Sequence, residues 1–140
     1  MTKLEQAKAL LETGEYTCVL CAGEKIYTAT QRGVKPLVHW LRQGDIPRGF
    51  SAADKVVGKA TAFLYCLLGA KAVYARVMSQ SAREALKSAG IHAQWETLTE
   101  HIINRKGDGM CPFEAAVLEL QQPEEALSAI EAKMKEMGIE

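Results

Sequence analysis

The sequence has no excess of either charge and no long apolar run. Its 140 residues include 17 basic and 17 acidic side chains. Without a net charge, no overall field attracts a nucleic acid polymer or an anionic membrane, so we expect neither as a partner. No stretch reaches the roughly 18 consecutive apolar residues of a membrane-spanning helix. The N-terminus begins an amphipathic helix pattern in place of a signal core, which predicts a cytoplasmic protein.

Cysteines are also few for a chain of this size. Cys18, Cys21, Cys66 and Cys111 do not suffice for a disulfide scaffold, and we expect reduced thiols. Cys18 and Cys21 have a CxxC spacing, but on a predicted strand residues three apart face opposite sides, so the pair is not expected to bind metal. Cys66 falls in an apolar helix, where a thiol packs as a small hydrophobic group. The histidines show no zinc-motif spacing, and we expect no metal and no cofactor.

What is present is a regular alternation of helical and strand patterns. With 48% hydrophobic residues, the chain predicts a single domain over residues 1–140. Apolar periodicity predicts helices over 2–13, 36–41, 51–67, 81–89, 112–120 and from Pro123 onward. Runs rich in β-branched and aromatic residues predict a hairpin of strands 16–21 and 25–30, then strands over 72–78 and 91–97. Because a helix separates the last two strands, we expect them to be parallel. The order predicts an α/β fold, a three-layer α/β/α sandwich with a mixed sheet of about four strands.

The stretch from Asn104 to Glu114 places a cysteine directly before a helix that begins with proline. Pro112 suits the first helical position, which makes Cys111 the N-cap, where backbone N–H groups lower a thiol's pKa. Gly109 lets the preceding loop approach a ligand closely. Cys111 is therefore a candidate nucleophile, with Glu114 as its acid or base. The structural alternative is a packed thiol and a capping-box glutamate.

A second candidate site lies at the start of the predicted helix over residues 51–67. Asp54 and Lys55 would lie in its first turn, where the helix dipole is positive, and Lys59 follows one turn later. Asp54 is a candidate for proton transfer, and the two lysines could hold a phosphate or carboxylate. The alternative is a capping box between Ser51 and Asp54. Because ligands bind at helix N-termini along one sheet edge, we expect Asp54 and Cys111 to share a cleft.

Cationic and polar side chains near the glycine loop could contact an anionic ligand. Asn104 and Arg105 lead into the loop that carries Cys111, so we count them among the candidate binding residues. Arg32 and Lys106 are interpreted as ordinary solvated surface.

Three sequence segments together resemble the DUF1893 family, a group of uncharacterised proteins with a cytidine-deaminase-like fold. These segments are Ser-Ala-Ala-Asp-Lys-Val-Val-Gly-Lys-Ala at 51–60, Val-Tyr-Ala at 73–75, and Asn-Arg at 104–105 leading to Cys-Pro-Phe-Glu at 111–114. The resemblance runs from about residue 16 to residue 120. It implies a central mixed sheet flanked by helices and a deaminase-like cleft.

The resemblance also implies what the cleft lacks. Active zinc deaminases carry His- or Cys-x-Glu at the start of the central helix and Pro-Cys-x-x-Cys at a later helix start. This chain has Asp54 and Lys55 at the first place, and Cys111-Pro112 reverses the order at the second. Zinc-dependent deamination is therefore disfavoured, and we expect this protein to share the cleft of the deaminases but not their metal chemistry.

Three functions remain open from the sequence. The leading hypothesis is a protein that binds a nucleotide-like or anionic small molecule in a cleft lined by Asp54, Lys55, Cys111 and Glu114. The first alternative is a thiol enzyme or redox protein that uses Cys111. The second is a regulatory or scaffolding homodimer, in which the polar groups only cap helices.

Overall fold

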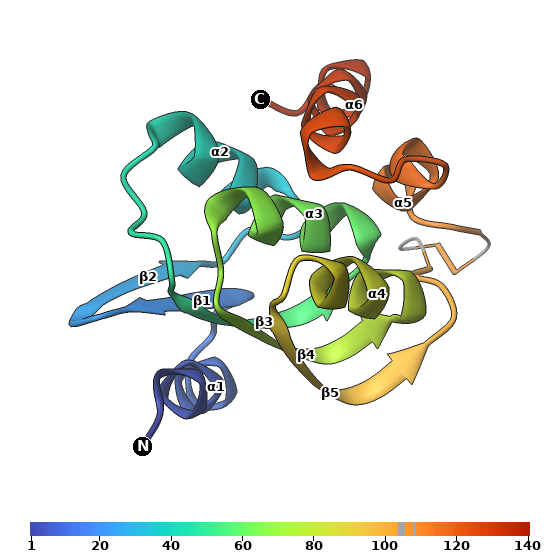
Figure 1. Ribbon diagram of the computed structural model, residues 1–140. Coiled ribbons are helices and arrows are strands. Elements are labelled where there is room, and N and C mark those ends of the chain that lie inside the picture. Colours follow the sequence, from blue (N-terminus) through green and yellow to red (C-terminus); the bar gives the residue numbers. More distant parts are fainter. Residues whose placement is uncertain (104–105, 108) are drawn as a thin grey trace.

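The computed structural model describes residues 1–103, 106–107 and 109–140, so the predicted binding residues Asn104 and Arg105 lie outside the described residues. The chain forms a mixed α/β fold (Figure 1). In chain order the elements are α1 (Lys3–Thr13), β1 (Cys18–Ala22), β2 (Lys25–Ala29), α2 (Lys35–Gln43), β3 (Ser51–Val57), α3 (Lys59–Leu68), β4 (Ala72–Ser79), α4 (Gln80–Ser88), β5 (His92–Thr99), α5 (Pro112–Val117) and α6 (Pro123–Glu136).

The strands form one five-stranded sheet in the order β2-β1-β3-β4-β5. β1 pairs antiparallel with both β2 and β3, whereas β3, β4 and β5 are mutually parallel neighbours. The predicted hairpin and the predicted parallel pair of later strands are therefore confirmed. In this arrangement β3 is the middle strand, and the sheet changes from antiparallel to parallel at it.

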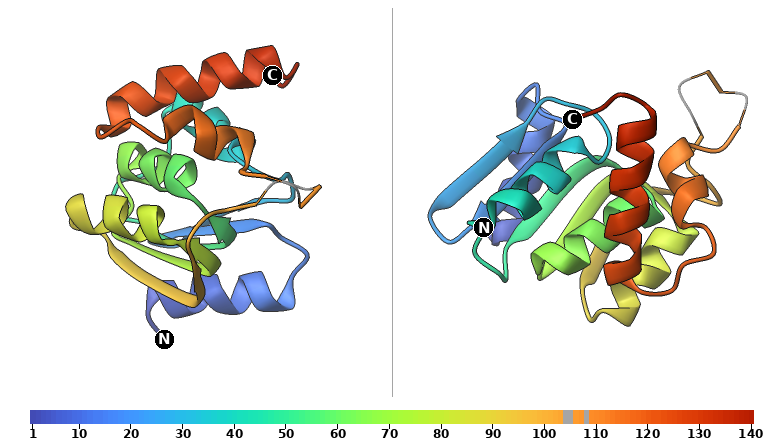
Figure 2. Two further views of the ribbon diagram at one scale, coloured as in Figure 1. Left: turned by 90° about the vertical axis from the view of Figure 1, so that its right-hand side faces the viewer. Right: turned by 90° about the horizontal axis from the view of Figure 1, so that it is seen from above.

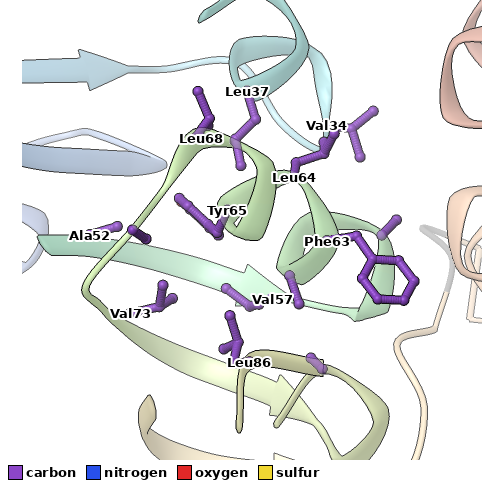
Figure 3. Close-up of a cluster of buried hydrophobic side chains, with 14 of the residues drawn as sticks. Val34, Leu37, Ala52, Val57, Phe63, Leu64, Tyr65, Leu68, Val73 and Leu86 are labelled. Carbon is purple, nitrogen blue, oxygen red and sulfur yellow. The ribbon is translucent and has the colours of Figure 1, made fainter. Parts of the chain in front are cut away.

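Helices cover the two faces of the sheet unequally. One face carries α1, whose Leu4, Ala7 and Leu11 pack against β1, β3 and β4. The opposite face carries α2, α3 and α4, and α6 packs on the outer side of α3 (Figures 1 and 2). Figure 3 shows part of the larger core, with Val57, Tyr65 and Val73 between α3 and the sheet. In the described part of the chain, no helix is both long and apolar enough to cross a membrane.

The prediction of one helix over residues 51–67 is wrong in its first half. Residues Ser51–Val57 form strand β3, and the helix begins only at Lys59, after Gly58. Asp54 and Lys55 therefore lie on a strand, and the predicted capping box between Ser51 and Asp54 does not form. Helices cover both faces of a middle strand, so buried and exposed residues do not alternate along it. The small apolar residues of Ser51–Val57 therefore appeared in the sequence as a continuation of the apolar helix pattern that follows them. This segment also accounts for the fifth strand.

The CxxC prediction depends on the side-chain alternation of β1. Cys18 packs into the larger core beneath α3, whereas Cys21 packs beneath α1 on the other face of the sheet. The two thiols are thus separated by the sheet itself, as the alternation of a strand requires.

Candidate functional site

A cavity of about 470 Å³ lies at the carboxyl end of β3 and the start of α3. It brings together four of the predicted site residues, Asp54, Lys55, Cys111 and Glu114, from segments that are more than fifty residues apart in sequence. The other lining residues come from the residue before β1, the loop after β2, the end of β3, the start of α3 and either side of the glycine loop: Thr17, Arg32, Gly33, Val34, Val56, Gly58, Ala60, Thr61, Ile102, Ile103 and Phe113. Lys59 and Gly109 are described but do not line it.

Glu114 is buried in the wall of the cavity and caps a helix. Its Oε1 accepts a hydrogen bond from the backbone N–H of Lys59 at 3.0 Å, and its Oε2 accepts one from that of Ala60 at 3.0 Å. These N–H groups belong to the first turn of α3, which has no side-chain cap from its own N-cap residue, Gly58. A carboxylate at this place satisfies two unpaired donors and complements the positive end of the helix dipole. Glu114 is thus a helix cap, as the structural alternative predicted, but it caps α3 and not its own helix α5.

Gly58 is required by the position of that carboxylate. A Cβ atom at residue 58 would lie 2.4 to 2.6 Å from the three carboxyl atoms of Glu114. The backbone of Gly58 has φ −97° and ψ −177°, which any residue can adopt. The glycine is therefore explained by close approach of Glu114 and not by backbone conformation.

Asp54 is the second buried carboxyl group of the cavity, with 8% of its surface exposed. The Tyr65 hydroxyl donates to its Oδ2 at 2.7 Å, and the Val56 N–H makes a long contact of 3.4 Å with its Oδ1. The Cys18 sulfur lies 2.9 Å from the same hydroxyl. Because the single hydroxyl proton is directed to Asp54, the Cys18 thiol is the donor to Tyr65. The three side chains form a chain of hydrogen bonds from the core to the cavity.

The surroundings of Asp54 shift its titration toward neutral pH. Burial raises the pKa of its carboxyl group to about 6, and the hydrogen bond from Tyr65, together with the nearby backbone N–H groups of Val56 and Lys55, opposes this only in part. The same burial, together with the Asp54 charge, raises the pKa of the Tyr65 hydroxyl and of the Cys18 thiol well above their ordinary values. Of the three hydrogen-bonded side chains, Asp54 is therefore the one that can gain or lose a proton near neutral pH.

Cationic side chains are distributed unequally around the cavity. Lys55 and Arg32 are exposed and line the opening. Lys59 points elsewhere: its ammonium group donates to the Leu118 carbonyl at 2.9 Å and lies 5.6 Å from the centre of the Phe63 ring. Its predicted role as a ligand contact therefore has no support in the geometry, while its backbone N–H serves the cap described above.

Cys111 occupies the predicted N-cap position of α5, but its side chain makes no cap hydrogen bond. The helix has only six residues, Pro112–Val117, so the dipole argument for an activated thiol is weaker than the predicted longer helix implied. Cys111 is half-buried and lines the cavity. All four cysteines are free, and burial raises the pKa of Cys21 and raises that of Cys66 to about 11.

A sequence profile for a domain of unknown function, TM1506 (DUF1893), matches residues 6–134. The chain belongs to the DUF1893 family. The structure is similar to the crystal structure of a DUF1893 family protein (TM1506) from Thermotoga maritima, with a TM-score of 0.85 and 28% sequence identity. That similarity covers 93% of this chain and 88% of the other. No curated protein matches the chain.

The DUF1893 fold places different residues at the helix starts than the sequence suggested. α3 begins with Gly58-Lys59-Ala60, and α4 begins with Ser79-Gln80-Ser81. Neither start has a His-x-Glu or Pro-Cys-x-x-Cys pattern. Among the described residues, no three His, Cys, Asp or Glu side chains are grouped closely enough to hold a metal ion.

The sequence interpretation missed three residues of the candidate site and its hydrogen-bond network in this DUF1893 protein. Tyr65 was hidden within an apolar helix pattern, and Cys18 was considered only as part of the CxxC spacing. Arg32 was interpreted as solvated surface, yet it lines the cavity. A tyrosine on the buried side of an otherwise apolar helix is a usable signal, because its hydroxyl needs a polar partner in the core.

Proposed function

We propose that this protein binds a small anionic or nucleotide-like molecule in the cavity at the carboxyl end of β3. The observation that carries this proposal is the buried carboxyl group of Asp54 at the cavity wall. Burial of a carboxylate lowers the stability of the fold unless its charge is fully compensated. Asp54 has one short hydrogen bond and one long contact, so it retains acceptor capacity toward the cavity.

The distribution of polar groups supports a ligand with two different ends. A carboxylate within the cavity accepts hydrogen bonds from N–H groups, such as those on the edge of a nucleobase. Lys55 and Arg32 at the opening suit a phosphate or carboxylate at the other end. Between them, Val34, Ile102 and Phe113 offer apolar surface for a flat ring.

We also propose that the cavity is a deaminase-like cleft that works without zinc. The mixed sheet with helices on both faces supports the deaminase-like assignment. The position of Glu114 supports a role without zinc-dependent deamination, because both of its carboxylate oxygens accept hydrogen bonds from backbone N–H groups of α3. A glutamate held in this way is a cap and not a free proton carrier. The four free thiols favour a reducing compartment, and we propose the cytoplasm.

Isothermal titration calorimetry with cytidine and adenosine 5′-monophosphates, the matching nucleosides and inorganic phosphate tests the proposal. We expect a nucleotide to bind, and Lys55→Ala and Arg32→Ala to weaken it about tenfold or more by removing charge-assisted hydrogen bonds. Asp54→Asn should alter the preference between bases. Asp45→Asn, an exposed change in the loop before β3, is the matched control. If no probe binds, or if the variants bind as the wild type does, the proposal is wrong.

Thiol chemistry at Cys111 is the second candidate function, favoured by its place in the cavity wall. Cys18, Cys21 and Cys66 do not line the cavity. The distinguishing measurement is Cys111→Ser: a binding protein keeps its nucleotide affinity within about threefold, whereas a thiol enzyme loses turnover entirely while its ligand still binds.

A further inference from the structure

The two edges of the sheet differ in how they are protected against pairing with another chain. β2, at one edge, has five residues and begins with Lys25. β5, at the other edge, has eight residues and contains no lysine, proline or glycine. Its residues His92–Trp95 and Thr97–Thr99 pair with β4 at one constant offset. Short strands, lysines and prolines are among the usual devices that block an edge, and β5 has none of these three; its one acidic side chain is Glu96.

The backbone of β5 offers hydrogen-bonding groups on its outer side. The His92 N–H donates to the Lys71 carbonyl, next to β4, so the polar groups of His92 point inward. Because backbone direction alternates along a strand, those of Ala93 and Trp95 point outward. Within the described ranges, no strand pairs with this outer side.

The side chains of β5 are complementary to a second, antiparallel copy of themselves. A twofold axis beside Gln94 places His92 of each copy opposite Glu96 of the other. It also places Trp95 opposite the small side chain of Ala93, as an outward-facing pair that exchanges backbone hydrogen bonds. Moving the twofold axis by two residues, to a position beside Glu96, sets Glu96 opposite Glu96, which is repulsive.

The side chains next to β5 are also compatible with a second copy placed across this twofold axis. Trp95 is 37% exposed, and the guanidinium carbon of Arg83 from α4 lies 5.9 Å from its ring centre. A shallow hollow joins α4 to the first half of β5, and Arg83, Glu84 and Lys87 contribute to it. One acidic and two basic side chains on each α4 can meet their opposites across a twofold axis.

We propose that two copies of this chain associate through β5, in an antiparallel pair that extends the sheet across both molecules. The interface consists of β5 around Gln94, flanked by α4 of each copy. The cavity beside Asp54 is lined by β3, α3 and α5 and does not include β5. Each copy therefore keeps its own site, and the pairing does not depend on the proposed ligand.

Analytical ultracentrifugation of the full chain, with charge-swap variants, tests the proposal. We expect the wild type to form dimers, Glu96→Arg to raise the dissociation constant about tenfold, and the double change His92→Glu with Glu96→Arg to restore it. Trp95→Lys should abolish dimers. Ile26→Lys, an exposed residue on the opposite edge strand, is the matched control and should leave the dimer unchanged.

Hydrogen exchange gives an independent readout of the same interface. The outward N–H groups of Ala93 and Trp95 should gain protection as protein concentration rises, because they become strand hydrogen bonds. A monomer at every soluble concentration would overturn the proposal. So would a dimer that responds to Ile26→Lys but not to the changes on β5, or a dimer without protection at these two N–H groups.

Discussion

Glu114 and Asp54 are two buried carboxyl groups in the wall of one cavity, and their partners differ. Glu114 is 7% exposed and Asp54 is 8% exposed, so burial does not distinguish them. Both oxygens of Glu114 accept backbone N–H groups at the start of α3. Asp54 has a hydroxyl donor and one long backbone contact, and its pKa is about 6.

The difference separates a carboxyl group whose two oxygens are both occupied by backbone donors from one that keeps acceptor capacity. A carboxylate with two backbone donors at a helix N-terminus stabilises the fold through its charge. A carboxyl group that is buried with incomplete compensation opposes folding when it is ionised, and such groups concentrate at functional sites. The cavity wall thus carries one carboxyl group that serves as a helix cap, Glu114, and one whose pKa lies near neutral pH, Asp54.

The largest effect should follow from removal of the Glu114 cap. Glu114→Ala leaves the N–H groups of Lys59 and Ala60 without partners, and we expect a loss of about 4 kcal/mol in the free energy of unfolding. Glu114→Gln keeps one acceptor oxygen, and its free energy of unfolding should fall by about half as much as that of Glu114→Ala. Urea denaturation measures both changes, with the exposed Glu119→Ala as control. A loss below about 1 kcal/mol for Glu114→Ala would contradict the structural role.

A change at Asp54 should instead alter how stability depends on pH. The folded-state pKa of about 6 lies above the ordinary aspartate pKa of 3.8. Ionisation is therefore harder in the folded state, and the wild type loses stability as the pH rises through this interval, by about 3 kcal/mol. Asp54→Asn lacks this dependence. Its stability relative to the wild type should rise by that amount between acid and neutral pH.

Thermal and urea unfolding of the two proteins across this pH interval measure the difference. Other titrating groups cancel in the comparison, and Asp45→Asn, at an exposed position, should give a constant offset. A constant offset for Asp54→Asn as well would show that Asp54 is not buried and ionisable in the way described.

A smaller effect tests the contact between Gly58 and Glu114. Gly58→Ala places a methyl group within 2.6 Å of the Glu114 carboxylate, and we expect a loss of about 2 kcal/mol in stability. In a Glu114→Ala background the same change should have almost no effect, since the opposing atoms are gone. The double-mutant cycle measures the coupling directly. Additive losses would mean that Gly58 is needed for another reason.

The smallest effect on stability should come from Cys111, although it should be the most reactive thiol. Cys18 and Cys21 are buried, and the pKa of Cys66 is about 11, whereas Cys111 lies half-buried at the cavity. Limited alkylation with mass-spectrometric mapping should label Cys111 first, and Cys111→Ser should change stability by less than about 1 kcal/mol. Earlier labelling of Cys66 would contradict this order.

Most elements could be predicted because their signals are local. The hairpin of β1 and β2, the strand at β4 and the helices at α1, α4 and α6 each have a periodicity and a boundary residue of their own. The exception was Ser51–Val57, where burial on both faces removed the alternation that marks a strand. That error moved Asp54 from a strand to a helix, so its hydrogen-bond partners were predicted wrongly even though its place beside Cys111 was expected.

The sequence by itself determined the residue types and the local patterns from which the cavity is built: a proline-started helix after Cys111, a glycine before Lys59, and a carboxyl group at position 54. Only the tertiary structure decided what each group does. Glu114 caps a helix whose first residue lies 55 positions earlier, and Tyr65 reaches Asp54 and Cys18 across the core. These partners are set by how α3 packs on the sheet and how α5 packs against α3, because hydrogen bonds between distant segments leave no periodicity in the chain.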